Sequence, residues 1–317
     1  MWFFSKMMLS VLIVANFLFV RPGLGVVEYR SESDNLPCVR QILSTMGILS
    51  MKISPSGDKL AVLFERFNTG IQELAILDMA TGQIDKSFRA SSLDPDFSSR
   101  TKSVLSVQWG QENYYVLYLA GDRILQMNIE RGEITWMGDC RGCSSFVTHP
   151  TGSTAVIRKP SHDPLYRLEV SSPYRSSPRS VTVGGLPGGD ASFSPDGRQI
   201  AYLVVSGQPS TITHYAIQSL DLYSKRIVTT NAESVFSPPW ISDRAFIVSD
   251  PNSMALWKYD IVSNTQSLFV QLVTGNPDDE WVRGVAYMPS NRFLAFVTGR
   301  YSDDLYIADL ACLQRTK

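Results

Sequence analysis

Hydrophobic and polar positions follow one another along most of the chain in a repeated order: an apolar segment, a short polar turn and a second apolar segment. Residues 190–203, which read Asp-Ala-Ser-Phe-Ser-Pro-Asp-Gly-Arg-Gln-Ile-Ala-Tyr-Leu, are the best copy, and residues 47–63 are the first clear one. Weaker copies lie at residues 104–119, 145–157, 235–248 and 284–297. In the Ser-Pro-Asp-Gly turn the proline presets φ and the glycine accepts a positive φ, so each copy predicts a β-hairpin.

A further apolar segment follows each copy and ends on a polar residue that is usually acidic. These last residues are Asp78, Asn128, Glu169, Asp221, Asp260 and Asp309. They recur about every 46 positions, and a turn and a final strand lead from each of them into the next copy. Six such units predict an all-β chain folded as a β-propeller of six four-stranded blades, with seven blades as the alternative count. A β-sandwich with regular turns is the alternative fold, and in either case we expect almost no helix.

The last unit is one strand short of a full blade, because its third strand is predicted at residues 305–309. A fourth strand has to come from elsewhere in the chain, or the blade keeps an open edge. Residues 26–29 and residues 39–43 are the two candidates. Cys38 would then lie beside Cys312, as a disulfide in an oxidising compartment or as a buried thiol pair in a reducing one.

The first 25 residues are the most apolar part of the chain. Lys6 precedes an apolar run from Met7 to Val20, and Gly23-Leu24-Gly25 has the small-x-small form of a signal-peptidase site. This order predicts a secretory signal peptide rather than a membrane span, for which the run is too short. The alternative is a first propeller strand at residues 10–20, which are rich in β-branched and aromatic side chains. We therefore divide the chain into an N-terminal segment, 1–25, and a propeller, 26–317.

Composition and charge narrow the function. Lys and Arg number 29 and Asp and Glu number 30, so the net charge of −1 argues against a nucleic-acid partner. The chain has three histidines, no Gly-x-Ser-x-Gly elbow and no recognisable pair of catalytic carboxylates. We therefore predict no catalytic residue, no cofactor and no small-molecule substrate, and expect a protein that is not an enzyme.

Cys140-Arg141-Gly142-Cys143 is the only cysteine cluster. Asp139 and His149 are near it in the sequence, but a structural zinc site would need a second cysteine pair. A redox Cys-x-x-Cys pair normally opens a helix, whereas this one lies between two predicted strands. We expect a plain loop or a local disulfide at Cys140 and Cys143, and no metal site.

Two loops stand out from the repeat. Residues 171–180 are polar and hold Ser-Pro dipeptides at Ser172 and Ser177, so they are either a flexible connection or a phosphorylation site that adds charge to the rim. Residues 93–102 lengthen the first connection between blades, and we expect them to be an exposed excursion.

The Ser-Pro-Asp-Gly turn with the following Ile-Ala-Tyr resembles WD40-type and TolB-type propellers over residues 47–312, although Gly-His and Trp-Asp dipeptides are absent. A more specific resemblance is to the aladin family of WD-repeat nucleoporins. It is carried by residues 21–57, 136–143, 180–197 and 267–290. On that alignment residues 10–15 fall on a propeller strand, while the long N-terminal region and the earliest blades of the family are missing or truncated.

The aladin resemblance implies a non-catalytic scaffold for protein–protein interaction at the nuclear pore complex of the nuclear envelope. Its implied partners in nucleocytoplasmic transport are a transmembrane nucleoporin and other pore subunits, and its cysteines would be reduced. The alternative is a TolB-like binding module that a signal peptide sends to the endoplasmic reticulum lumen or out of the cell, with a Cys38–Cys312 bridge. The state of the N-terminus and of the thiols separates the two hypotheses.

Overall fold

The computed structural model describes most of the chain from Cys38 onward. The described residues are 38–45, 47–66, 69, 71–93, 104–110, 112–160, 165–171, 177–183, 186–206, 212–219, 224–229, 239–250, 253–274, 281–290, 292–298 and 303–315. The N-terminal segment 1–25, assigned either to a signal peptide or to a strand, lies outside them.

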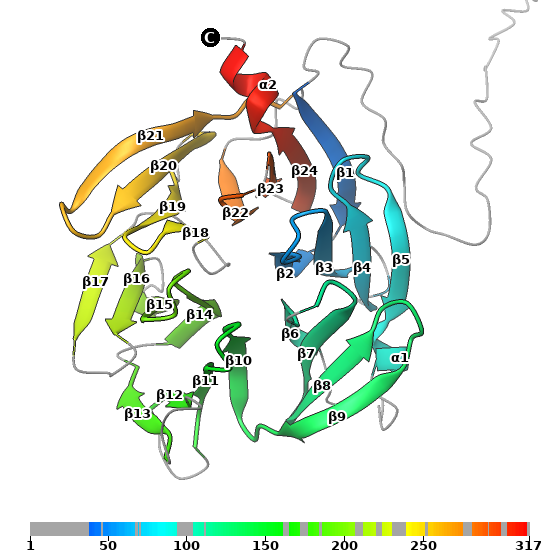
Figure 1. Cartoon of the computed structure of the whole chain (residues 1–317), viewed down its shortest axis with the longest axis vertical. Coiled ribbons are helices and arrows are strands. Elements are labelled where there is room, and N and C mark those ends of the chain that lie inside the picture. Colours follow the sequence, from blue (N-terminus) through cyan, green and yellow to red (C-terminus); the bar gives the residue numbers. More distant parts are fainter. Residues whose placement is uncertain are drawn as a thin grey trace, which may run out of the picture.

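In the described part of the chain, twenty-four antiparallel strands form six four-stranded sheets, which surround a central axis as the blades of a β-propeller (Figure 1). In blades 1 to 3 the strands, from innermost to outermost, are β2 (Gly47–Ile53), β3 (Lys59–Glu65), β4 (Gln72–Asp78) and β5 (Ile84–Arg89); β6 (Val104–Trp109), β7 (Tyr115–Ala120), β8 (Arg123–Asn128) and β9 (Ile134–Asp139); and β10 (Cys143–Thr148), β11 (Thr154–Arg158), β12 (Arg167–Ser171) and β13 (Arg179–Thr182).

In blades 4 to 6 they are β14 (Leu186–Phe193), β15 (Gln199–Ser206), β16 (Ile212–Ser219) and β17 (Lys225–Thr229); β18 (Trp240–Ser242), β19 (Ala245–Ser249), β20 (Ala255–Asp260) and β21 (Thr265–Gln271); and β22 (Val282–Tyr287), β23 (Phe293–Thr298), β24 (Asp303–Asp309) and β1 (Val39–Thr45). The predicted fold class and the count of six blades are confirmed.

The polar turn between the first two strands of a blade is built by its serine and glycine. In blade 1, Gly57 takes a φ of 80°, and its N–H donates to the carbonyl of Ser54 at 2.9 Å. The Ser54 hydroxyl accepts the N–H of Lys59 at 3.0 Å and so fixes the start of β3. The Ser-Pro-x-Gly sequence therefore favours the hairpin in two ways: the serine side chain binds the backbone of the turn, and the glycine accepts the positive φ.

The acidic residue that ends the third strand of a blade holds the next turn. Oδ1 of Asp78 accepts the N–H of Thr81 at 2.7 Å, and Oδ1 of Asp260 accepts the N–H of Ser263 at 2.9 Å. Asn128 does the same for Arg131 at 3.0 Å. Donation from the backbone N–H groups lowers the pKa of Asp78 and of Asp260. At these three strand ends the polar residue is thus a turn cap, which neutral asparagine can also supply. Glu169 differs, because it lies within β12 and accepts a hydrogen bond from Arg158 at 2.8 Å.

The middle strands of blade 1, β3 and β4, are buried on both faces because the blade lies between two others. All five residues from Leu60 to Phe64 in β3 are at most 3% exposed. This explains why these strands are continuous apolar runs rather than alternating ones. Apolar clusters fill the seams between blades, and the smallest cluster is in the seam of blades 2 and 3, where the buried members are Leu119, Cys140, Cys143 and Phe146.

The ring is closed by β1, which is the outermost strand of blade 6 although it precedes blade 1 in the sequence. It pairs antiparallel with β24, and Val39 lies opposite Ala308. Of the two candidate segments, the structure uses the one that contains residues 39–43. Arg40 then reaches the turn between β4 and β5 of blade 1 and donates to the carbonyls of Ala80 and Thr81 at 2.6 and 3.1 Å.

Two short helices interrupt the strands of the described residues: α1 (Ala90–Leu93) and α2 (Leu310–Arg315). Neither has the length or the apolar character to cross a bilayer. Leu93, which the sequence placed in an exposed excursion, is fully buried, and its carbonyl accepts a hydrogen bond from the hydroxyl of Tyr118. This part of the prediction is wrong because α1 folds the start of the connection back onto blades 1 and 2.

Candidate functional site

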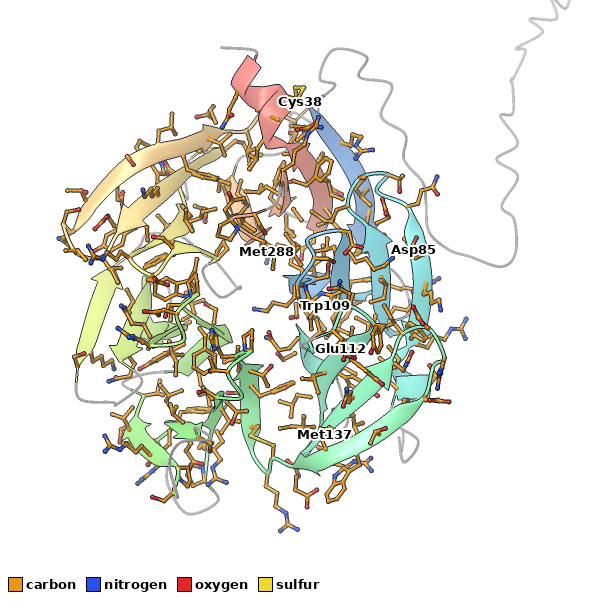
Figure 2. All side chains as sticks on the ribbon, viewed as in Figure 1. Cys38, Asp85, Trp109, Glu112, Met137 and Met288 are labelled. Carbon is orange, nitrogen blue, oxygen red and sulfur yellow. A yellow bond between two sulfur atoms is a disulfide. The ribbon has the colours of Figure 1, made fainter. Side chains whose placement is uncertain are left out.

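The candidate binding site is at one mouth of the central channel, where two adjoining cavities of about 380 and 470 Å³ share several lining residues. Trp109 and Met288 lie on either side of this opening (Figure 2). The lining residues come from the ends of the innermost strands and from the turns that follow them. Cavities of this size, built from several elements and mostly apolar, are typical of ligand sites.

The rim of the mouth is rich in proline. Five blades contribute a proline each from the turn or segment next to the innermost strand: Pro55, Pro150, Pro195, Pro239 and Pro289. Blade 2 instead presents Trp109 and Gly110. Because proline has no N–H, this rim offers ring surface and carbonyl groups but few backbone donors. Hydrogen-bond donors must therefore come from the side chains of the wall.

Among the described lining residues, the side-chain donors include Gln108 and Lys52. Gln108 is only 7% exposed, and its Nε2 has no hydrogen-bond partner. Lys52 is partly buried on β2 and is the one Lys or Arg of the described lining, in which no aspartate or glutamate occurs. The described lining therefore combines a mostly apolar surface with one positive charge, while the amide nitrogen of Gln108 is buried beneath that surface.

The walls of the mouth are held by hydrogen bonds between blades. The indole Nε1 of Trp109 donates to the carbonyl of Lys52 at 2.7 Å, which joins blade 2 to blade 1. In the same way, Nε1 of Trp240 donates to the carbonyl of Ser192 at 3.4 Å, which joins blade 5 to blade 4. Both indole N–H groups are thereby used, so the rings contribute flat apolar faces at fixed positions.

His149, the one histidine at the mouth among the described residues, is held at both ring nitrogens. Nδ1 accepts the N–H of Thr151 at 3.3 Å, and Nε2 lies 3.0 Å from the carbonyl of Pro195 in the next blade. Its ring also meets Phe193 edge to face, with centroids 5.6 Å apart. These contacts assign the proton to Nε2 and make His149 a link between blades 3 and 4.

Buried polar side chains also tie neighbouring blades together. The hydroxyl of Ser145 accepts the N–H of Ala191 at 3.1 Å, and the carboxylate of Asp303 accepts the N–H of Ile48 at 2.6 Å. Asp303 also pairs with Arg283. Burial raises the pKa of Asp303, although its hydrogen bonds and Arg283 act in the other direction. These bonds link blade 3 to blade 4 and blade 6 to blade 1.

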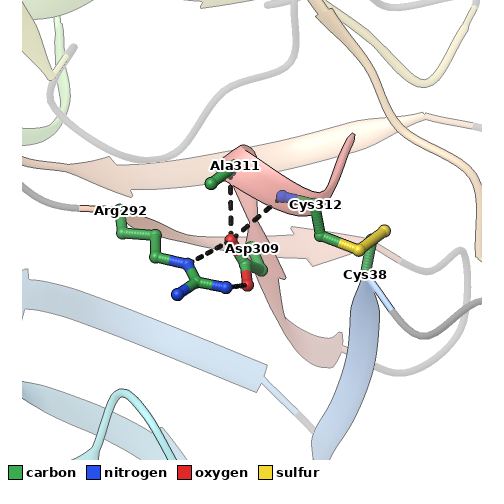
Figure 3. Close-up of a disulfide and its surroundings, with 5 residues drawn as sticks. All are labelled: Cys38, Arg292, Asp309, Ala311 and Cys312. Carbon is green, nitrogen blue, oxygen red and sulfur yellow. Dashed lines mark hydrogen bonds and ion pairs between the residues drawn. A yellow bond between two sulfur atoms is a disulfide. The ribbon is translucent and has the colours of Figure 1, made fainter. Parts of the chain in front are cut away.

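Cys38 and Cys312 form a disulfide between the residue that precedes β1 and helix α2, with Cα atoms 5.3 Å apart (Figure 3). Asp309 fixes α2 beside it, because its Oδ1 accepts the N–H groups of Ala311 and Cys312 at 3.0 and 3.2 Å. Arg292 donates to the same carboxylate at 2.7 Å and lowers its pKa. The bond thus links the two strands that close the ring.

Cys140 and Cys143 form a second disulfide, across the turn that joins blade 2 to blade 3. Both are buried, at 7 and 6% exposed. Gly142 takes a φ of 68°, and a Cβ there would lie 2.4 Å from the carbonyl of Lys159. Arg141 in the same turn is exposed. No group of three or more potential metal-ligating side chains occurs among the described residues.

Ser177 is exposed just before β13, while Ser172 lies outside the described residues. Ser177 does not line the two cavities. The mouth itself was not predicted from the sequence, although one signal was present: a proline next to a strand end in five of the six blades. That signal was interpreted only as turn chemistry, because the sequence does not show that the five turns meet around one axis.

No protein-family model and no curated protein matches the chain. Among solved structures, regucalcin, a calcium-binding protein from Agrobacterium tumefaciens, is 9% identical with a TM-score of 0.55, covering 84% of this chain and 92% of its own. An auxiliary nutrient binding protein from Bacteroides thetaiotaomicron is 10% identical with a TM-score of 0.53, covering 84 and 69%. At these identities the similarity concerns the fold alone.

TolB from Acinetobacter baumannii is also similar, at 16% identity and a TM-score of 0.43. The match covers 57% of this chain and 42% of TolB, so the chain spans less than half of that protein. The fold and the cavities together define the class: the chain is a six-bladed β-propeller with a central mouth. A propeller fold does not by itself indicate a function, which depends instead on the residues of the site that the loops and strand ends build.

Proposed function

We propose that the protein is a non-catalytic binding scaffold of an oxidising compartment, either the lumen of the endoplasmic reticulum or the exterior of the cell. The observation that carries the proposal is that all four cysteines are in disulfides. Structural disulfides persist in secreted and luminal proteins and are rare where glutathione keeps thiols reduced. The basic start, apolar run and small-residue exit of residues 1–25 support the same route.

The binding role is supported by the mouth. Its surface is mostly apolar, and it is fixed by bonds between blades. The histidine at the mouth uses both ring nitrogens for those bonds, and no carboxylate lines the described part of the cavities. General acid–base catalysis needs a titratable group that can reach the reacting proton. Lys52 and Tyr287 are the titratable groups that the described lining adds to this histidine, and no carboxylate accompanies them, so the lining favours holding a ligand over converting it.

The competing proposal is the nuclear pore scaffold that the aladin resemblance implies. It rests on the order of short motifs in the sequence and requires Cys38, Cys312, Cys140 and Cys143 to be reduced thiols. A transmembrane nucleoporin would then be the partner that holds the protein at the nuclear envelope. Phosphorylation at the exposed Ser177 would belong to this setting, where kinases act.

One mass measurement separates the two proposals. The protein is isolated from its native cells under non-reducing conditions, alkylated, digested and measured, with a reduced sample as the control. Loss of residues 1–25 together with four cysteines that resist alkylation supports the oxidising compartment. An intact N-terminus with four alkylated cysteines would overturn it, and imaging at the nuclear rim would follow.

A further inference from the structure

We propose that the outer edge of blade 5 is a self-association surface, through which two copies of the chain form a symmetric dimer. The edge is strand β21, and the occupant that we assign to it is the same strand of a second copy, running antiparallel to the first. The dimer depends neither on the mouth nor on the compartment of the protein.

The outer side of β21 is open. This strand is the outermost of blade 5, and no other described strand pairs with its outer side (Figure 1). Residues 265–268 are all exposed and lie opposite β20 in an unbroken register, which shifts only at the bulge that follows them. A regular exposed edge presents N–H and C=O groups with which a further strand can pair.

β21 also lacks the charge that the other outermost strands carry. Its sequence, Thr-Gln-Ser-Leu-Phe-Val-Gln, contains no charged residue, no proline and no glycine. Each of the other five outermost strands has at least one charged residue, such as Lys86 on β5, Asp139 on β9, Arg179 on β13, Lys225 on β17 and Arg40 on β1. Charged side chains on an edge disfavour pairing with another chain, so among the described edges only that of β21 lacks this protection.

Exposed apolar side chains follow the same edge. Val262, Leu268 and Val273 are 63, 47 and 51% exposed, and they lie in the turn before β21, within the strand and just after it. They are three of the eight exposed large hydrophobic side chains of the described residues. Single exposed apolar residues are common, but a row of three along one unprotected strand is typical of a surface that another chain covers.

The spacing of these side chains fits a two-fold axis. Val262 precedes Leu268 by six positions, and Val273 follows it by five. In an antiparallel pair with its axis near Leu268, Val262 of each copy therefore comes close to Val273 of the other, and the two Leu268 side chains lie near the axis. A contact that uses the same patch twice closes after two copies, so we expect a dimer rather than a filament.

The charges nearest to the edge do not oppose this pairing. Lys258 on β20 lies opposite Ser267, and Asp260 lies opposite Thr265. The two Lys258 side chains of a dimer would be three strand spacings apart, which is about 14 Å at about 4.8 Å per spacing. This separation exceeds the Debye length of about 8 Å at physiological ionic strength, so their repulsion is largely screened.

Sedimentation velocity of the purified chain, over concentrations from about 1 to 200 μM, tests the association. A seven-residue edge buries less surface than a standard protein interface, so we expect a dimer with a Kd on the order of 10 μM. A chain that stays monomeric at about 200 μM would overturn the proposal and would leave the edge to a strand of a different protein.

A pair of lysine variants locates the interface. Leu268→Lys supplies the missing charge and should weaken the dimer at least about 10-fold, and because Leu268 is exposed the melting temperature should stay close to that of the wild type. Met137→Lys is the matched control, since Met137 is 53% exposed on the outermost strand β9, and it should leave the Kd unchanged. Equal weakening by both variants, or none by Leu268→Lys, would show that the dimer does not use β21.

Hydrogen exchange of the wild-type protein covers the case in which the Leu268 variant does not fold. The outward-pointing amides of β21 should exchange more slowly at about 200 μM than at about 1 μM, whereas exchange in β5 and β9 should not depend on concentration. A dimer in which the exchange of β21 stays the same would refute the proposed interface.

Discussion

The Cys38–Cys312 bond allows a prediction about stability that can be worked from its place in the chain. Its two residues are 274 positions apart, so the bond closes nearly the whole propeller into one loop. In the chain-entropy model, a cross-link of this span removes about 5.6 kcal/mol of conformational entropy from the unfolded state at 25 °C. The variant Cys38→Ser/Cys312→Ser should therefore lose up to about that much of the free energy of unfolding.

The second disulfide is the matched control within the same molecule. Cys140 and Cys143 are 3 positions apart, and the same model gives about 1.6 kcal/mol for their bond. The variant Cys140→Ser/Cys143→Ser should therefore be much less destabilised than the ring-closing variant, apart from packing lost in the seam of blades 2 and 3. The entropy of unfolding is about 2.1 cal/mol/K per residue, so for 317 residues the full loss should lower the melting temperature of the ring-closing variant by about 8 °C relative to the wild type.

Urea unfolding without reductant, followed by tryptophan fluorescence, measures both variants. Loss of the long cross-link lets the unfolded chain expand, so the slope of free energy against urea should also rise. The short cross-link should leave that slope nearly unchanged. The reasoning is refuted if the ring-closing variant loses less than about 1 kcal/mol of the free energy of unfolding. It is also refuted if this variant loses no more free energy than the control does and has the same slope against urea.

Substitutions at three further positions test the turns and the mouth. Asp309→Ala should lower the free energy of unfolding by about 1–2 kcal/mol because the cap of α2 is lost, whereas Asp309→Asn should keep the cap and lose only the pairing with Arg292. Because the pKa of Asp309 is lowered in the folded protein, the carboxylate stabilises the fold above pH 3.8. The stability advantage of the wild type over Asp309→Asn in urea titrations should therefore shrink only as the pH falls below 3.8. Gly142→Ala should cost roughly 2 kcal/mol or more in the same assay, since φ is 68° and the Lys159 carbonyl is 2.4 Å from the added Cβ; wild-type stability would disprove the strain. Trp109→Phe should cost about 1–2 kcal/mol by loss of the bond between blades, and an unchanged melting temperature would show that this bond is not needed.

The blade architecture could be predicted because its determinants are local. The copy at residues 47–63 holds its own turn chemistry, and the structure builds β2, the turn and β3 from it. The acidic strand ends, such as Asp78 and Asp260, act within three residues of themselves. A pattern whose cause lies within a few residues repeats visibly in a sequence.

The mouth could not be predicted, because its residues meet only through the ring. Lys52, Gln108 and Met288 lie on three different blades, and nothing in the spacing between them shows that they share a cavity. The burial of Leu93 could not be predicted for the same reason, because its hydrogen-bond partner Tyr118 is on another blade. Long-range contacts of this kind depend on how complete blades pack, which the local hydrophobic pattern does not encode.

The closure of the ring by β1 has a consequence for synthesis on the ribosome. β1 is the first of the described strands to be translated and its partner β24 is the last, and at about 5–20 residues per second the interval between them is on the order of 15–50 s. Blades 1 to 5 can form during that time, but β1 has to wait beside them without a partner. Cys38 reaches Cys312 only after the final blade has been made, so the oxidation of Cys38 to this bond would mark a chain in which all six blades have been synthesised and the ring has closed.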